Sequence, residues 1–351
     1  MQNLELSIMK PEAHNKYYKT DIIIIGAGPA GLFSIFEAGM LKMKCHVIDT
    51  LDFVGGQCTA LYPEKPIYDI PAHPQILAAE LIEKLEEQAR PFDPVFHLGQ
   101  RVEKLERLAD QTLKITTSKN TTIEAKAVII AAGCGAFGPN RPPIANIKSF
   151  EGKSVFYMVK NKKDFAGKRI VIAGGGDSAV DWALSLADVA QKISIIHRRD
   201  KFRCAPESAD RLKQLAAVGK IEMVVPYQLE DLQGKNGNLN QVIVKDFSGN
   251  IKAIEADILL PFYGLAMELG PIANWGLNLH KNLIEVNFTT MQTSESGIYA
   301  IGDIGHYQNK LKLILSGFAE AATACHSAYH LVHPNTLLHF EYSTSKGISS
   351  N

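Results

Sequence analysis

The sequence lacks closely spaced cysteines. No two of its five cysteines form a C-x-x-C pair; they are Cys45, Cys58, Cys134, Cys204 and Cys325. This spacing indicates neither a dithiol redox centre nor a zinc site built on paired cysteines. We therefore expect five reduced thiols that act as small apolar side chains, and no metal site.

Net charge and uninterrupted apolar runs are also missing. Lys plus Arg and Asp plus Glu both number 37, so bulk charge gives no support to binding of nucleic acid or a membrane surface. The first 20 residues contain Glu5 and Glu12 and no apolar run of signal-peptide length, which predicts a cytoplasmic protein. Ile22–Leu41 has the length of a membrane span, but the cluster Gly26–Gly31 interrupts it, and we expect no membrane association.

What the sequence does contain is a nucleotide-binding unit near its start. Asp21–Ile25 has the pattern of a buried parallel strand, and Gly26–Gly31 follows as a G-x-G-x-x-G motif. A helix is expected over 29–42 and a second strand over 45–48, which ends at Asp49. Together these elements predict one βαβ half of a doubly wound sheet.

Each position of this motif has a physical role. Gly26 permits the turn out of the strand, Gly28 lets the backbone approach a pyrophosphate, and Gly31 lets the helix pack closely on the sheet. The pyrophosphate would then meet the positive end of the helix dipole. Asp49 lies 23 residues after Gly26, where its carboxylate can accept both ribose hydroxyls of an adenosine.

A second unit repeats the same spacing. The strand Lys168–Ala173 leads into Gly174–Ala179, a G-x-G-x-x-A variant, followed by a helix over 178–190 and a strand over 193–196. His197 lies 23 residues after the first glycine of this motif, which is the same spacing as from Gly26 to Asp49 in the first unit. The sequence therefore predicts two dinucleotide-binding folds.

The two units differ in charge where a cofactor would be chosen. Unit one ends in Asp49, whereas unit two continues as HRRDKFR from His197 to Arg203. A carboxylate would repel a 2′-phosphate, and guanidinium groups would bind it. We therefore expect FAD in the first fold and NADP(H) in the second. The predicted NADPH contacts are Gly174, Gly176, Ser178, Arg198, Arg199 and Arg203.

A third signal lies near the C-terminus. Ser296–Asp303 has the pattern of a strand ending in Gly-Asp, and an apolar segment follows over 311–329. Asp303 could accept a hydrogen bond from a flavin polyol, and the helix N-terminus would stabilise negative charge on a reduced flavin.

Because the FAD signals lie at both ends of the chain, the fold class is α/β with two Rossmann-like domains and an inserted NADPH domain. We place the NADPH domain at 141–263 and a discontinuous FAD domain at 1–140 and 264–351.

These residues resemble the two-dinucleotide-fold flavoproteins that include thioredoxin reductases. That branch carries a C-x-x-C shortly before its second glycine motif, whereas Ser154–Phe165 here contains no cysteine. A narrower resemblance, over about residues 20–345, is to the thioredoxin-reductase-like ferredoxin–NADP⁺ reductases. It rests on the segments GGQ at 55–57, LYPEK at 61–65, YDI at 68–70, AGCGAF at 132–137 and YSTS at 342–345.

The resemblance implies further contacts and a homodimer. Tyr62 would stack on one face of the flavin, and Tyr342 from the other subunit would cover the second face. The FAD contacts it implies, with Asp49, are Gln57, Tyr62, Val102, Phe137, Asp303, Tyr342 and Thr344. This chain has Asp49 where the family usually has Glu, Tyr342 where relatives can have His, and Cys134 where an aliphatic residue is common.

The expected activity is transfer of hydride from NADPH to FAD, followed by single-electron transfer to ferredoxin or flavodoxin. The flavin performs the chemistry, so we predict no catalytic side chain. An acidic partner favours a basic docking patch, and the candidate residues are Lys160, Lys162, Lys163, Lys168 and Arg169. Two alternatives stay open: an NADPH-dependent flavoprotein that reduces a quinone or other small acceptor, and a non-catalytic flavin redox sensor.

Overall fold

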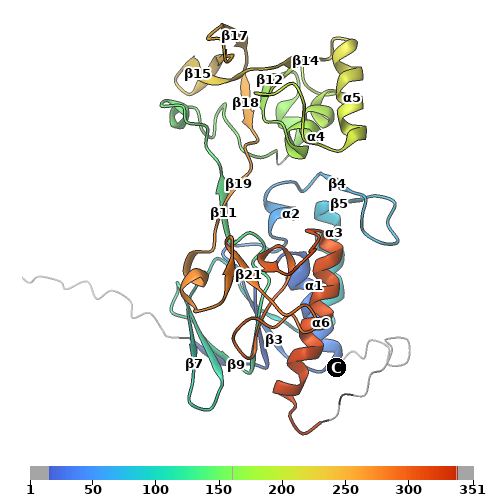
Figure 1. Ribbon diagram of the computed structural model, residues 1–351, viewed down its shortest axis with the longest axis vertical. Coiled ribbons are helices and arrows are strands. Elements are labelled where there is room, and N and C mark those ends of the chain that lie inside the picture. Colours follow the sequence, from blue (N-terminus) through green and yellow to red (C-terminus); the bar gives the residue numbers. More distant parts are fainter. Residues whose placement is uncertain (1–15, 160, 337, 339–351) are drawn as a thin grey trace, which may run out of the picture. The chain divides into compact units, whose positions relative to one another are not determined.

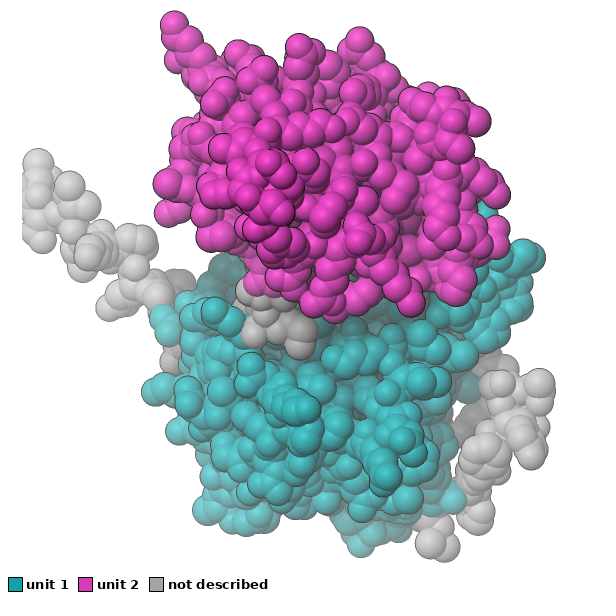
Figure 2. Space-filling model, turned by 45° about the horizontal axis from the view of Figure 1, so that its top comes forward, with its two compact units in different colours: residues 1–136, 268–351 teal, residues 137–267 magenta. Residues whose placement is uncertain are grey.

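The computed structural model describes residues 16–159, 161–336 and 338. The chain divides into two units (Figure 2), unit 1 with Met1–Ala136 and Glu268–Asn351, and unit 2 with Phe137–Met267. The divisions that we placed after residues 140 and 263 each differ by four residues from these (140 − 136 and 267 − 263). The chain passes between the units through β11 (Ala136–Pro139) and β19 (Leu265–Glu268), which form a two-stranded sheet.

Unit 1 is built on a five-stranded parallel sheet in the order β22-β10-β2-β3-β6. Its strands are β22 (Ile298–Ala300), β10 (Ala127–Ile130), β2 (Ile22–Ile25), β3 (Cys45–Ile48) and β6 (Val95–His97). The central strand β2 is four buried isoleucines in a row, which is the composition of a strand covered on both faces. The prediction of strands at 22–25 and 45–48 is confirmed.

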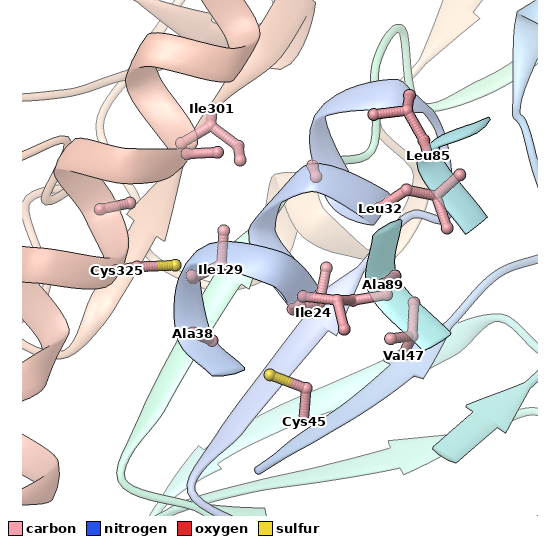
Figure 3. Close-up of a cluster of buried hydrophobic side chains, with 14 of the residues drawn as sticks. Ile24, Leu32, Ala38, Cys45, Val47, Leu85, Ala89, Ile129, Ile301 and Cys325 are labelled. Atoms are coloured by element: carbon pink, nitrogen blue, oxygen red, sulfur yellow. The ribbon is translucent and has the colours of Figure 1, made fainter. Parts of the chain in front are cut away.

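Three helices cover one face of this sheet (Figure 1): α1 (Pro29–Met40), α3 (Ala78–Ala89) and α6 (Ile314–Val332). The close-up in Figure 3 shows their core, in which Ile24 and Val47 of the sheet pack against Leu32 of α1. Helix α1 ends two residues before the predicted position because Lys42 adopts a left-handed φ of 59°.

A second sheet covers the opposite face of the parallel sheet. It has the order β1-β9-β8-β7, and Ile115 and Ile123 from it form a second core with Ile23 and Ile25 of β2. Its strands are β1 (Tyr17–Lys19), β9 (Thr122–Ala125), β8 (Leu113–Thr117) and β7 (Val102–Arg107). The smaller elements of unit 1 are α2 (Gln57–Ala60), β4 (Pro66–Ile67), β5 (Ile76–Leu77), β20 (Leu279–His280), β21 (Leu283–Glu285) and β23 (Gly305–His306).

Unit 2 repeats the three-layer plan on a smaller scale. A parallel sheet in the order β14-β13-β12-β18 packs through one face against an antiparallel sheet in the order β15-β16-β17, and α4 packs on β12 and β13. The strands are β12 (Arg169–Ala173), β13 (Lys192–Ile196), β14 (Ile221–Val224), β15 (Gln228–Lys235), β16 (Asn238–Lys245), β17 (Ile251–Glu255) and β18 (Ile258–Pro261), and the helices are α4 (Asp177–Leu186) and α5 (Pro206–Ala217). The predicted second βαβ unit is confirmed, with α4 ending four residues early.

The apolar stretch Ile22–Leu41 is divided between strand β2 and helix α1. Among the residues that the structure describes, no helix has the length and hydropathy needed to cross a bilayer.

A buried histidine pair gives unit 1 a pH-dependent contribution to stability. Nδ1 of His46 and Nε2 of His97 are 2.9 Å apart, and the Tyr18 ring packs on both imidazoles. Burial and the neighbouring His97 lower the pKa of His46 from its ordinary value to about 4. Burial also lowers the pKa of His97. The hydrogen bond needs one donating and one accepting ring nitrogen, so protonation of the accepting nitrogen would break it.

We expect the free energy of unfolding to fall as the pH drops from 6.5 towards 4. In that window the unfolded chain takes up a proton at His46 while the folded chain does not, which lowers stability by an amount on the order of 3 kcal/mol at the acid end. Urea unfolding of wild type and His46→Phe at pH 7.5, 6.5 and 5 measures this difference. Equal pH slopes for the two proteins would contradict it.

Candidate functional site: two nucleotide-binding loops

The loop between β2 and α1 uses its three glycines in different ways. Gly26 has φ +110°, and an added Cβ would lie 2.3 Å from the carbonyl oxygen of Ala131. A Cβ on Gly31 would lie 1.9 Å from the carbonyl oxygen of Gly26. A Cβ on Gly28 would meet no described protein atom closer than the Cα of Gly56, at 4.0 Å. Packing within the protein therefore requires glycine at 26 and 31, whereas the open space at Gly28 suits a ligand.

The start of α1 adds a favourable electrostatic field to this loop. Gly28 is the N-cap residue, no side chain caps the helix, and its first turn contains no acidic residue. The free N–H groups and the positive end of the helix dipole therefore remain for an anion such as a pyrophosphate.

Asp49 extends from the end of β3 to the same loop. Its Oδ2 accepts a hydrogen bond from the N–H of Ala27 at 2.7 Å, and its Oδ1 accepts one from the N–H of Leu51 at 2.8 Å. Burial raises the pKa of Asp49, and these backbone bonds oppose that shift. The carboxylate is thus held beside the glycine loop, where a ribose attached to the pyrophosphate would lie.

Strands β2, β10 and β22 end side by side, because Ile25 pairs with Ile130 and Ile130 with Ala300. The segments that follow these strands therefore meet at one edge of the sheet. They carry Gly26, Cys134 and Asp303. Gln57 joins them, since its Nε2 lies 3.4 Å from Sγ of Cys134.

Tyr62 belongs to the same neighbourhood. Its hydroxyl oxygen lies 3.9 Å from Sγ of Cys58. Burial raises the pKa of both groups, and the negative charge of Asp303 adds to the shift in each case. The structure therefore brings Asp303, Gln57 and Tyr62 together around the glycine loop, although 246 residues separate Gln57 from Asp303 (303 − 57).

The remaining residues predicted to contact FAD are less closely grouped. The side chain of Val102 is buried in the second core of unit 1, two residues after Gln100, whose N–H donates to the carbonyl oxygen of Asp49. Phe137 lies in β11, at the division between the units. Tyr342 and Thr344 lie outside the described residues.

The loop between β12 and α4 repeats the pattern in unit 2. A Cβ on Gly174 would lie 2.6 Å from the carbonyl oxygen of Phe262. At Gly176, the N-cap residue of α4, an added Cβ would meet nothing closer than the carbonyl oxygen of Arg203, at 3.9 Å. Ser178 is exposed in the first turn of α4. As in unit 1, packing requires glycine at the first position of the motif, Gly174. Space for a ligand remains at the third position, Gly176.

The basic segment after β13 packs directly on this glycine loop. The N–H of Arg203 donates to the carbonyl oxygen of Gly175 at 2.6 Å, and the N–H of Ala205 donates to Oδ1 of Asp177 at 3.0 Å. Arg198, Arg199 and Arg203 are exposed. Backbone bonds therefore place the arginines at the mouth of the second loop and leave their guanidinium groups accessible.

His197 also lies at the second loop, although it was not among the predicted NADPH contacts. An added Cβ on Gly175 would lie 2.2 Å from the His197 ring, so the imidazole occupies the space beside the loop. Burial lowers the pKa of His197, and the positive charges of Arg203, Arg198 and Arg199 lower it further. Its Nε2 is buried without a partner among the described residues. Its position in the sequence could have identified it, because His197 follows the second strand of its unit as Asp49 does in the first unit.

The comparisons with known proteins agree with this geometry. Residues 20–325 match the family described as pyridine nucleotide-disulphide oxidoreductase. The chain belongs to this family.

Its relatives include two proteins named ferredoxin–NADP reductase. The protein from Rickettsia akari (strain Hartford) is 62% identical over 94% of this chain and 98% of its own length. The protein from Paramagnetospirillum magneticum (strain ATCC 700264 / AMB-1) is 58% identical with the same coverage of each chain. Among solved structures, Lactococcus lactis thioredoxin reductase matches with a TM-score of 0.78 and 25% identity, over 90% of this chain and 99% of that one. The resemblance and the fold class predicted from the sequence are thereby confirmed.

Within this family, the present chain has no C-x-x-C pair before its second glycine motif. All five cysteines are described and free. Burial raises the pKa of Cys58 to about 11, which disfavours the nucleophilic thiolate. In the described part of the chain, no group of three or more His, Cys, Asp or Glu side chains could hold a metal ion.

The segment that lacks the C-x-x-C lines a cavity of about 840 Å³ in unit 2, together with Lys168 and Asp257. Phe156, Tyr157 and Met158 of that segment supply apolar and aromatic surface.

Among the described residues of the predicted docking patch, Lys168 lines this cavity, whereas Arg169 is paired with two carboxylates. Its guanidinium bonds to Oδ1 of Asp257 and to Oε2 of Glu255, both at 2.7 Å, so its charge is compensated. Lys160 lies outside the described residues.

Proposed function

We propose that the protein is a ferredoxin–NADP⁺ reductase in which unit 1 binds FAD and unit 2 binds NADPH. The observation that carries the proposal is the contrast between the two loops. Each has an open glycine at a helix N-terminus, but a carboxylate lies beside the first and three guanidinium groups lie near the second. The relatives that share about 60% of the sequence over almost their full length carry the name ferredoxin–NADP reductase.

The residues of unit 1 fit FAD. The open space at Gly28 leaves room for a pyrophosphate, the carboxylate of Asp49 lies where a ribose would follow, and Asp303 can accept from the polyol. Tyr62 offers a ring beside Asp303 for the flavin. FAD, when bound, would accept a hydride from NADPH and release electrons one at a time. The remaining FAD contacts that we propose are Gly26, Gly31, Gln57, Val102, Phe137, Tyr342 and Thr344.

The residues of unit 2 fit NADPH. Gly174, Gly176 and Ser178 would hold the pyrophosphate at the start of α4, and the arginines at 198, 199 and 203 would bind the 2′-phosphate. The protein's contribution is to bind and orient the two cofactors, and we assign no catalytic side chain. The same proposal includes a homodimer in which Tyr342 covers the flavin of the other subunit. It also includes ferredoxin or flavodoxin as the electron acceptor.

Anaerobic reduction followed by an acceptor assay tests the proposal. Purified protein should be yellow, NADPH should bleach the flavin absorbance, and cytochrome c reduction should increase strongly when ferredoxin is added. If NADPH bleaches the flavin but ferredoxin gives no increase, the assignment of ferredoxin as acceptor is wrong. The assignment of FAD and NADPH as cofactors is then retained. Rapid quinone turnover that is insensitive to salt would then favour a small acceptor. Failure of NADPH to bleach the flavin would favour a redox sensor.

A further inference from the structure

Glu320 of helix α6 forms a buried ion pair with Lys310, which precedes the helix, at the edge of the sheet at which β22 ends. The side chains of Lys310 and Glu320 are 6% and 4% exposed, and Nζ of Lys310 bonds to Oε1 of Glu320. The hydroxyl of Tyr307 donates to the same Oε1 at 2.8 Å. Oε2 of Glu320 accepts the N–H of Gly302 at 2.7 Å. We call these four residues the Glu320 network.

The stability of the fold alone does not explain why a buried ion pair is present here. Desolvation of two charges offsets most of their attraction, so apolar residues of similar volume are often as stable or more stable at such positions. Here, however, both carboxylate oxygens are used, and one of them holds a main-chain N–H rather than a second side chain. The network therefore fixes the conformation of a particular loop.

That loop begins at Gly302, the residue before Asp303. Gly302 has φ +68°, and a Cβ on Gly317 of α6 would lie 3.2 Å from Cβ of Ala30 and 3.6 Å from Cα of Gly302. The end of β22, the first turns of α1 and helix α6 thus meet at one point. Glu320 lies one turn further along α6, and its bond to the Gly302 N–H orients the peptide that leads into Asp303.

The hydrogen-bond geometry agrees with an ionised carboxylate that is balanced by a lysine. Burial and the hydrogen bond to Glu320 raise the pKa of Tyr307 to about 12, so Tyr307 acts as a donor. The ammonium of Lys310 also lies 4.9 Å from the centroid of the Tyr307 ring, a favourable cation–π distance. Removal of either charged partner would leave the other buried and uncompensated beside the Gly302–Asp303 turn.

We propose that Glu320 is a positioning residue for FAD, which holds the Gly302–Asp303 turn against the flavin as a carboxylate whose charge Lys310 balances. This inference rests on the proposed flavin site in unit 1. It predicts two separate effects: a loss of FAD affinity when the turn is released, and a change in flavin midpoint potential whose sign follows the unbalanced charge.

The test uses Glu320→Gln, Lys310→Met and the double variant of the full chain. FAD dissociation constants come from titration of the apoprotein, and midpoint potentials come from anaerobic dye-coupled reduction. Glu320→Gln should weaken FAD binding about tenfold or more, since it removes a charged acceptor. Its potential should move to more positive values because the buried lysine favours the reduced anionic flavin. Lys310→Met should move the potential to more negative values, and the double variant should return towards wild type.

Matched controls separate this effect from general destabilisation. Glu80→Gln with Lys84→Met removes an exposed ion pair on α3 of the same unit, whose charged atoms lie 3.8 Å apart, and should change neither measurement. Tyr307→Phe removes one donor but no charge, so its potential should match wild type. Lys310→Met alone carries the test, with its expected shift to more negative potential, if Glu320→Gln does not fold.

The outcomes distinguish this inference from the proposed function. Wild-type protein that binds no FAD would overturn the proposed function itself. Wild type that binds FAD, with variants that show unchanged affinity or potentials that all shift in the same direction, would overturn the role of Glu320 and leave the flavin site intact.

Discussion

Replacement of Arg198 and Arg203 together by alanine should raise the KM for NADPH about 100-fold or more while the KM for NADH stays nearly constant. Each guanidinium can form a charge-assisted hydrogen bond worth about 1.5–3 kcal/mol to the 2′-phosphate, and about 1.4 kcal/mol corresponds to a factor of ten. NADH lacks this phosphate, so it loses nothing. The structure supports the choice of residues because both guanidiniums lie near His197, at the second glycine loop.

The measurement is steady-state reduction of an artificial acceptor with each nucleotide at constant ionic strength, since salt screens exposed charges. Arg211→Ala is the matched control, because Arg211 is an exposed arginine of α5 in the same unit. It should leave both Michaelis constants unchanged. Equal losses for NADPH and NADH in the double variant would show that the arginines do not bind the phosphate.

Alanine at Gly28 should weaken FAD binding roughly 100-fold while it leaves the apoprotein almost as stable as wild type. Among the described residues, the added Cβ meets no atom closer than the Cα of Gly56, at 4.0 Å, and φ at this position is −74°, so the folded chain accepts it. The methyl group occupies the space that the pyrophosphate would approach, and such a steric conflict is worth about 1–3 kcal/mol. The loss of stability should not exceed about 1 kcal/mol, the usual effect of an unfavourable N-cap residue.

Alanine at Gly31 should give the opposite result and is the natural control. Its Cβ would lie 1.9 Å from the carbonyl oxygen of Gly26, so helix α1 must move away from the sheet. We expect the apoprotein to lose about 2 kcal/mol or more. Thermal unfolding of both apoproteins and titration with FAD measure the contrast. A Gly28→Ala protein that keeps full FAD affinity would mean that no ligand approaches the backbone there.

Much of the fold was readable from the sequence because its signals are local. The four isoleucines at 22–25, the glycines that follow and the apolar helix after them are contiguous, and each element depends mainly on neighbours in the chain. The same holds for the second unit and for the contrast between Asp49 and the basic segment after β13. The ends of helices were harder to predict from the sequence. Helix α1, for example, ends before the predicted residue because Lys42 adopts a left-handed conformation.

The sequence by itself determined that the chain has two nucleotide loops of opposite charge, since spacing and residue type are local properties. Only the tertiary structure decided which distant groups share those loops. It placed the His197 ring on Gly175 and joined Glu320 of α6 to Gly302 and Lys310. Away from the loops, it paired Arg169 with Asp257. The position of His197 could be read from the repeat spacing, but no short pattern marks the Arg169–Asp257 and Glu320–Gly302 contacts, because they depend on how segments far apart in the chain pack together. A buried charge acquires its role from the partners that packing supplies.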